Sequence, residues 1–370
     1  MDQNKTFTER EYGLDVFRTI SMLFVIMVHI IGHGGLGTAY DSGTAGNIIA
    51  LFLQTAVYPA VNCFVLISGY LLAGRSFRLS RLLQIWITAV FWSVVIQCAF
   101  YVADPSAVSL GKTLFMFLPV LNGRYWFLNA YVVMILASPF MNHLLNTLPR
   151  WKIRALLLAA AAVFCIAPVL ALNNDVFATQ NGYSFPWFLV LYLTGGYIKK
   201  YVSRPQKGYP FLIAYLILCL LQLIWIAGID LIAVDALLAY RNMFMKYTSV
   251  LIYGEAICLL LYFRSDRHCR PTMFSKVCGF LSPMVFSVYL IHDHPLIRAE
   301  FMSERFAGAA EYPLPLVFIS VIVIALVVFM VCILLDCIRH YLFKLLKIPD
   351  LTNRCGDWVT EKITALLMRE

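Results

Sequence analysis

The sequence predicts an all-α, polytopic membrane protein, and three observations support this fold class. Hydrophobic residues make up 61% of the 370-residue chain, charged residues only 13%, and the mean hydropathy is +0.78. Soluble domains carry about a quarter charged residues. Ten apolar runs follow one another along the chain, and a membrane helix needs about 20 such residues. Basic residues gather in every second loop, which is typical of the cytoplasmic side of a membrane.

The apolar runs give the expected elements in order. They cover residues 14–34, 48–73, 82–103, 125–145, 154–172, 185–201, 210–229, 248–263, 279–299 and 314–338. Pro59 lies inside the second run. That run therefore predicts either an interfacial helix over about 46–57 and a short span, or one kinked helix. About ten transmembrane helices place both termini in the cytoplasm, and the excess of Lys and Arg near the termini agrees with this topology.

The domain organisation is simple. We expect residues 1–349 to form one integral-membrane domain and residues 350–370 a short cytoplasmic amphipathic tail, because Val359, Ile363 and Leu366 recur at helical spacing. The ten cysteines are scattered without a CxxC pair, so neither a disulfide framework nor a metal site is expected. The net charge of +9 follows from the membrane topology, and no nucleic-acid partner is expected.

The first apolar run contains two residues that lipid tolerates poorly, Arg18 and His29. Ionisable side chains inside a span usually face the bundle interior and have a function. The two are eleven residues apart, which places them within roughly 20° of one helix face and about 16 Å apart along the axis. Asp15 can pair with Arg18 from one turn before, and His33 follows His29 by one turn on the same side.

The predicted topology converts sequence positions into depths. Polar residues expected near the cytoplasmic mouth are Arg18, Arg75, Arg78 and Arg81, and those expected in the outer half are His29, Trp126, Asn129 and His292. Arginine binds phosphate through planar paired donors, and neutral histidine is the commonest general base near pH 7. A ligand with phosphates at one end and a reactive group on a long arm fits this arrangement. Acyl-coenzyme A has that shape.

Structural interpretations compete with each of these assignments. His29 and His292 could be packed, hydrogen-bonded histidines. The three arginines after the second run, at positions 75, 78 and 81, could be ordinary charges of a cytoplasmic loop. Trp126 could belong to an interfacial aromatic belt, and Glu255 could anchor two helices through a hydrogen bond. Asp15 is more typical of a structural partner for Arg18 than of a catalyst.

Five stretches, taken in order, resemble a known family. They are Arg18 and His29 in the first run, Ser68-Gly69-Tyr70 closing the second, the overlapping Arg75/Arg78 and Arg78/Arg81 pairs, RYWFLNAY around Trp126, and Tyr289-Leu290-x-His292. This pattern is similar to the membrane acyltransferase-3 family, whose members are integral-membrane O-acyltransferases of bacterial surface glycans. The chain departs modestly from the family's first-span pattern, with Phe17 in place of leucine and Ser21 in place of alanine.

The resemblance implies a function and a site. An acyl group, acetyl by analogy, would pass from cytoplasmic acyl-CoA (acetyl-CoA) to a hydroxyl of a cell-surface polysaccharide or lipid-linked sugar. His29 would be the general base, and His292, Tyr289 or Asn129 the oxyanion donor. Residues expected to hold the donor are Arg18, Arg75, Arg78, Arg81 and Ser68. A covalent intermediate on Ser68 is less attractive, because Ser68 is predicted far from His29 in depth. No metal is expected.

The implied home is the bacterial cytoplasmic (inner) membrane, where the protein would be multi-pass, contact lipid and meet a glycan or lipid-linked sugar. The sequence is also compatible with a homo-oligomer. A competing function is a proton-coupled permease or exporter of a glycan or its precursor, because intramembrane Arg, His and Glu suit proton coupling. The lack of internal repeats and the gathering of arginines on one face disfavour it. Dependence on coenzyme A would separate the two functions.

Overall fold

The computed structural model describes residues 10–105, 114–120 and 123–367, and within these ranges it contains helices and no strand. The predicted all-α fold class is confirmed. Residues 1–9 of the predicted membrane domain and residues 368–370 of the predicted tail lie outside the described residues. The helices of the first half are α1 (Tyr12–Ile31), α2 (Ala45–Val57), α3 (Ala60–Leu72), α4 (Leu79–Ala103), α6 (Trp126–Thr147), α7 (Arg150–Ala161) and α8 (Ala167–Leu170). Those of the second half are α9 (Phe185–Tyr201), α10 (Tyr209–Ile232), α11 (Asp235–Leu238), α12 (Val250–Phe263), α13 (Asp266–Cys269), α14 (Met273–Leu281), α15 (Val285–His292), α16 (Pro295–Ile297), α17 (Leu314–Leu345) and α18 (Ile348–Leu367).

All ten apolar runs form helices, but not all are long enough to cross a bilayer alone. Seven helical segments in the described residues have the length and composition of a span, and the bent pair α14–α15 makes an eighth. The remaining two runs form α9, with 17 residues, and α12, with 14. The second run is divided at Tyr58 and Pro59 into α2 and α3, which together count as one span, so the kinked alternative describes it.

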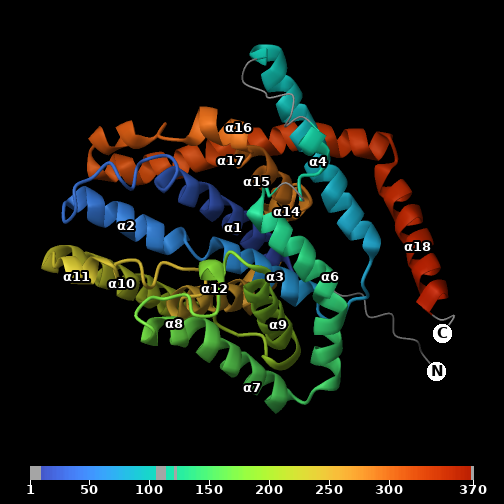
Figure 1. Ribbon diagram of the computed structural model, residues 1–370, viewed down its shortest axis with the longest axis horizontal. Helices are drawn as coiled ribbons and strands as arrows, with labels where there is room; N and C mark the ends of the chain where they lie inside the picture. Colours follow the sequence, from blue (N-terminus) through green and yellow to red (C-terminus); the bar gives the residue numbers. More distant parts are fainter. Residues whose placement is uncertain (1–9, 106–113, 121–122, 368–370) are drawn as a thin grey trace.

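Helix α1 lies at the centre of the molecule. It packs against α3, α12, α14, α15 and α17, and α17 runs beside it across the molecule (Figure 1). Phe17, Ile26 and Ile30 of α1 are fully buried. A helix surrounded on most sides is expected to direct its polar side chains toward neighbouring helices instead of lipid. The central position of α1 therefore explains how it can carry both an arginine and a histidine.

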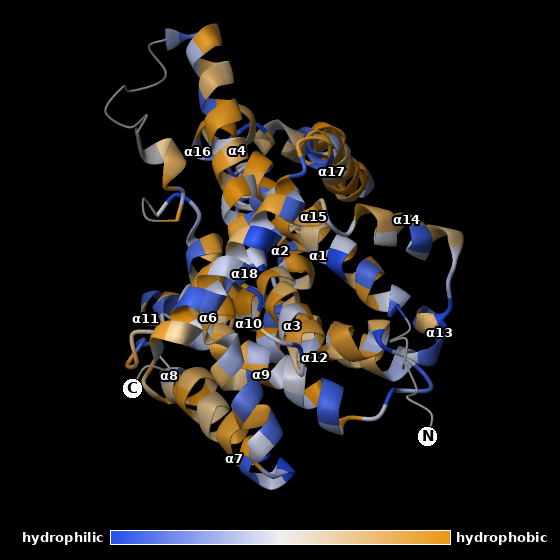
Figure 2. Ribbon diagram, turned by 90° about the vertical axis from the view of Figure 1, so that its right-hand side faces the viewer, coloured by the Kyte–Doolittle hydropathy of each residue, from blue (hydrophilic) through white to orange (hydrophobic). Residues whose placement is uncertain are grey.

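The outer surface is apolar where helices would meet lipid. Figure 2 shows hydrophobic residues over α4, α7 and α17. Leu334 and Ile338 on α17 and Leu231 on α10 leave more than half of their surface exposed. Because large apolar patches on a soluble protein would promote association, this surface fits a multi-pass membrane protein.

Two local breaks position the site. Helices α14 and α15 meet at 58°, with Ser282 and Pro283 in the break, where proline cannot continue the backbone ladder. Lys347, between α17 and α18, has a φ of 54°, and this left-handed conformation turns the chain sharply. Helix α18 then packs along α4, as Figure 1 shows. The tail predicted from residue 350 thus contains most of a regular helix that begins two residues earlier, at Ile348.

Candidate active site

Arg18 and His29 lie near opposite ends of α1 and line two different cavities. His29 borders a cavity of about 250 Å³, which we call the histidine cavity. Arg18 borders a cavity of about 840 Å³, which we call the cation-lined cavity. The end of α17, at Lys344, lines that same cation-lined cavity. The start of α1 and the end of α17 therefore lie on one side of the molecule, which is the side predicted to be cytoplasmic.

Helix α15 brings a second histidine against the first. His29 Nδ1 lies 3.1 Å from His292 Nε2, and His292 Nδ1 lies 2.6 Å from the carbonyl oxygen of Val288. A carbonyl oxygen only accepts, so His292 donates from Nδ1, and neutral His292 then accepts at Nε2. His29 must donate from Nδ1 to complete the pair. This chain of hydrogen bonds fixes the His29 tautomer and leaves the lone pair of His29 Nε2 free to accept a proton.

A carboxylate lies close to the histidine pair. Asp293 Oδ1 is 3.8 Å from His29 Nδ1 and 3.3 Å from a guanidinium nitrogen of Arg298. Asp293 is almost fully buried, so its negative charge would stabilise a protonated His29 more strongly than it would in water. Arg298 balances this carboxylate and itself lines the histidine cavity. Asp293 follows His292 directly in the sequence, which is the signal that could have identified it.

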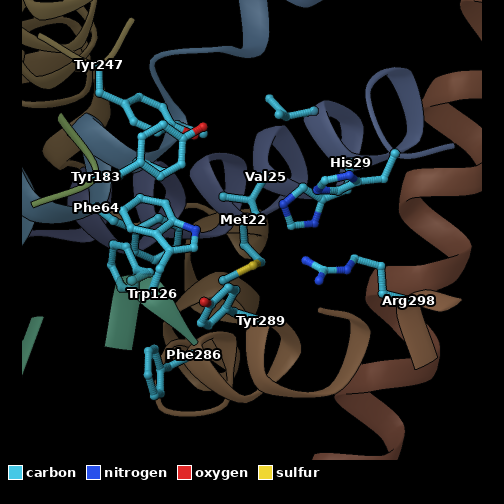
Figure 3. A pocket seen from close by; sticks show the side chains of 15 residues that line it. Met22, Val25, His29, Phe64, Trp126, Tyr183, Tyr247, Phe286, Tyr289 and Arg298 are labelled. Carbon is cyan, nitrogen blue, oxygen red and sulfur yellow. The ribbon is translucent and has the colours of Figure 1, made fainter. Parts of the chain in front are cut away.

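The rest of the histidine cavity is largely aromatic. Figure 3 shows Trp126, Tyr183 and Tyr247 on one side of it and His29 and Arg298 on the other. Trp126 lies 4.4 Å from Tyr183 and 5.8 Å from Tyr247 between ring centroids. Rings in such an array offer flat faces and hydroxyl groups together. Trp126 therefore lines the site, whereas Tyr183 and Tyr247 come from loops that sequence reasoning did not place there.

Tyr289 also lines the histidine cavity, where its hydroxyl is buried. No group in the described ranges accepts a hydrogen bond from this hydroxyl. A buried donor without an acceptor is costly and unusual in proteins, so the Tyr289 hydroxyl is available to a ligand. Of the three predicted oxyanion donors, Asn129 lines neither cavity, and His292 has protein partners at both ring nitrogens.

The cation-lined cavity gathers basic side chains from distant parts of the chain. Arg18, Arg81, Arg339 and Lys344 line it, and no Asp or Glu is among its described lining residues. Arg18 donates a hydrogen bond to the Ser282 hydroxyl at the break between α14 and α15. Arg339 is paired with Asp336, so the positive charge that favours an anionic ligand comes mainly from Arg18, Arg81 and Lys344.

The start of α4 divides the overlapping arginine pairs. Arg81 lies inside that helix and lines the cation-lined cavity, whereas Arg75 and Arg78 precede the helix and border a smaller neighbouring pocket with Arg81. Ser68 does line the cation-lined cavity. Its hydroxyl donates to the Phe64 carbonyl oxygen and lies 3.1 Å from the Tyr131 hydroxyl.

Three phenylalanines separate the two cavities. Phe64 of α3, Phe127 of α6 and Phe286 of α15 line both of them, and we call this set the phenylalanine collar. Phe64 and Phe127 meet edge to face with 6.4 Å between ring centroids. A ring of apolar side chains between two polar cavities resists the passage of water and ions. The collar therefore lies between a cavity lined by basic side chains and a cavity lined by His29.

Comparison with known proteins identifies the family of this chain. The chain belongs to the acyltransferase-3 family, because that family's acyltransferase domain matches residues 11–334. It is a membrane acyltransferase. A curated relative is the nodulation protein NolL of Sinorhizobium fredii (strain NBRC 101917 / NGR234), 27% identical over 273 residues that cover 70% of this chain and 69% of the relative. No solved structure matches the chain. The family membership favours the acyltransferase function over the permease alternative.

Proposed function

We propose that this acyltransferase moves an acyl group, acetyl by analogy, from cytoplasmic acyl-CoA to a sugar hydroxyl on the opposite side of the membrane. The observation that carries the proposal is the phenylalanine collar, which joins a cavity lined by cations to one that contains His29. The donor's phosphates would lie near Arg18 and Arg81. Its narrow arm would pass the collar and present the thioester to His29.

The reaction follows from the hydrogen-bond chain. The sugar hydroxyl gives its proton to His29 Nε2 while its oxygen attacks the thioester carbonyl carbon. The new C–O bond forms, the C–S bond breaks, and the departing thiolate takes up the proton from His29. Asp293, 3.8 Å from His29 Nδ1, stabilises the imidazolium between these steps. The Tyr289 hydroxyl donates to the developing oxyanion, a contribution typically of several kcal/mol in such sites.

The acceptor proposal rests on the aromatic wall. Sugars present apolar C–H faces edged by hydroxyl groups, and the stacked rings of Trp126 and Tyr247 offer a matching surface beside His29. We therefore propose a glycan or lipid-linked sugar as the acceptor, a bacterial cytoplasmic membrane as the location, and acyl-CoA as the co-substrate. His292, which holds the His29 tautomer, is assigned a positioning role in place of the oxyanion role.

The test is turnover of acetyl-CoA by purified protein in nanodiscs, with free coenzyme A measured by mass spectrometry. His29→Gln keeps side-chain volume but removes the base, and we expect turnover to fall roughly 10²–10⁴-fold. His143→Gln is the matched control, because His143 is exposed on α6, away from both cavities. Wild-type turnover by a folded His29→Gln protein would exclude the base assignment. Absence of acetyl-CoA binding by folded wild-type protein would exclude the proposed donor.

A further inference from the structure

The wall of the cation-lined cavity includes a segment beyond the family match, which ends at residue 334. Arg339, His340 and Lys344 at the end of α17, and Ile348 and Pro349 at the start of α18, line this cavity. The sequence placed the tail at the cytoplasmic surface and gave no reason to assign it chemistry. The structure instead makes this segment part of the candidate site.

Helical spacing brings the basic side chains of α17 to one face. Arg339 and Phe343 are four residues apart, as are His340 and Lys344, so the four side chains form two adjacent stripes. The Arg339 guanidinium lies 4.9 Å from the Phe343 ring centroid. All four residues line the cation-lined cavity.

Arg339 is held firmly in this wall. Its Nε and Nη2 donate to the two oxygens of Asp336 at 2.6 and 2.7 Å, and the Trp92 indole of α4 donates to the same carboxylate at 2.8 Å. Arg339 and Asp336 are both buried. A buried pair with this bidentate geometry has a fixed orientation. It therefore ties the end of α17 to α4 and leaves Lys344, which is exposed, as the adaptable cation of the wall.

Helix α18 closes the wall against α4. The chain changes direction at Lys347, and the Gln84 amide of α4 donates to the Thr352 hydroxyl at 3.2 Å. At Gly356 an added Cβ would lie only 2.8 Å from the backbone nitrogen of Ser80. The absence of a side chain at Gly356 lets the two helices approach closely. Ile348 and Pro349 are thereby held at the cavity.

We propose that Arg339, His340, Lys344, Ile348 and Pro349 form a phosphate-binding wall that recognises a nucleoside carrying clustered phosphates. Lys344 and His340 would add donors to those of Arg18 and Arg81, so that the phosphates are bound from both sides of the cavity. This inference rests on the proposed function and deepens it, because it assigns the charged end of the donor to residues outside the family match. The ligand chemistry is a group of phosphate monoesters and diesters, which a nucleotide or an anionic lipid headgroup could supply.

The experiment measures the Kd of coenzyme A and of dephospho-coenzyme A, which lacks the 3′-phosphate, in nanodiscs of zwitterionic lipid. Lys344→Gln removes the wall's exposed cation. Lys347→Gln is the matched control, because Lys347 is exposed three residues away and lines neither cavity. We expect Lys344→Gln to weaken coenzyme A binding about tenfold or more, as for loss of a charge-assisted hydrogen bond, and Lys347→Gln to leave it unchanged. A smaller loss for dephospho-coenzyme A would assign Lys344 to the 3′-phosphate.

Three other outcomes would overturn the inference, and they are distinguishable. In the first outcome, wild-type protein binds coenzyme A, Arg81→Gln binds it more weakly, and Lys344→Gln has the same Kd as Lys347→Gln. The wall then does not bind the donor, and the proposed function stands. If folded wild-type protein binds no coenzyme A, the proposed function fails with it. In the third outcome, Lys344→Gln binds coenzyme A as wild type does but is no longer stabilised against heat by nanodiscs of anionic lipid. The wall then binds a lipid headgroup instead of a nucleotide.

Discussion

At the residue scale, the proposed function of His29 depends on the hydrogen-bond partner of its Nδ1 atom. His292 accepts the hydrogen bond from His29 Nδ1 and donates its own to the Val288 carbonyl. His292 is only 2% exposed and does not line the histidine cavity. We therefore propose that His292 acts through His29 and does not contact a ligand. The arrangement corresponds to the orienting partner that accompanies a histidine base in many transferases and hydrolases.

A pair of substitutions tests this positioning role. In His292→Gln the amide oxygen can still accept from His29 Nδ1, whereas in His292→Leu nothing can. We expect His292→Leu to lower kcat by roughly 10²-fold or more with little change in KM, and His292→Gln to recover a substantial part of that loss. Steady-state kinetics with thermal melts would show it. Equal losses in the two variants would mean that His292 only fills space.

Tyr289 allows function and stability to be separated. Its hydroxyl is buried and has no described acceptor, so its removal leaves no described protein acceptor unpaired. We expect Tyr289→Phe to melt at or above the wild-type temperature while kcat falls about 10²-fold, as for loss of an oxyanion donor. A Tyr289→Phe protein that is less stable and fully active would assign the hydroxyl to the fold.

The relative positions of two residues were predictable from the sequence where both residues belong to one helix. Arg18 and His29 share α1, so helical spacing alone places them at the two cavities. Prediction failed where the result depends on packing between distant segments. Arg81, inside α4, lines the cation-lined cavity, whereas Arg78, directly before that helix, does not. Asn129 belongs to the same helix as Trp126 but lines neither cavity. The sequence predicted the depth of Asn129 in the membrane but not the helix face on which it lies.

At the element scale, the close crossing of α3 and α9 supports one side of the site. A Cβ added at Gly69 would lie 2.3 Å from the Tyr192 carbonyl oxygen, and one added at Gly195 would lie 2.3 Å from the Leu66 carbonyl oxygen. Small residues that allow helices to touch are a common device of membrane packing. The Ser68-Gly69-Tyr70 motif is thus partly structural, and Tyr70 supports this interpretation because Arg264 donates to its hydroxyl at 2.9 Å.

This crossing predicts a contrast between two glycine substitutions. Gly195→Ala should force α3 and α9 apart and lower the melting temperature, with a loss of about 1–3 kcal/mol typical of overpacking. Gly228→Ala on α10 is the control, because no atom of the described residues lies within 4 Å of the added Cβ. It should be neutral or stabilise the protein by up to about 1 kcal/mol through helix propensity. Equal melting temperatures for the two variants would contradict the packing seen here.

The elements themselves were largely predictable, because apolar length and punctuation by proline are local properties. All ten runs are helical, and Pro59 and Pro283 mark real breaks. The short lengths of α9 and α12 follow from the predicted runs over 185–201 and 248–263. Both lie against other helices, α9 on α3 and α6, and α12 on α10 and α3. An apolar helix that is too short to cross the bilayer can thus be buried by contacts with other helices.

At the scale of the whole molecule, the phenylalanine collar determines whether the two cavities are separate. In Phe286→Ala the collar loses one of its three rings. We expect proteoliposomes with this variant to dissipate a proton gradient faster than wild type, measured with an enclosed pH-sensitive dye. Phe280→Ala is the control, because Phe280 is exposed on α14 and lines neither cavity. Equal permeability of Phe286→Ala and wild-type vesicles, with both proteins folded, would show that the collar is not the barrier.

The thinness of the collar has an electrical consequence. Where water-filled spaces approach each other from opposite ends, a membrane voltage falls mainly across the dry layer between them, here a few aromatic rings. Moving one elementary charge through that layer would involve about 2.3 kcal/mol for each 100 mV. An acyl group carries no charge, and the cations of one cavity and the histidine pair of the other lie on either side of the layer. The proposed transfer would therefore proceed at the same rate in an energised and a de-energised membrane.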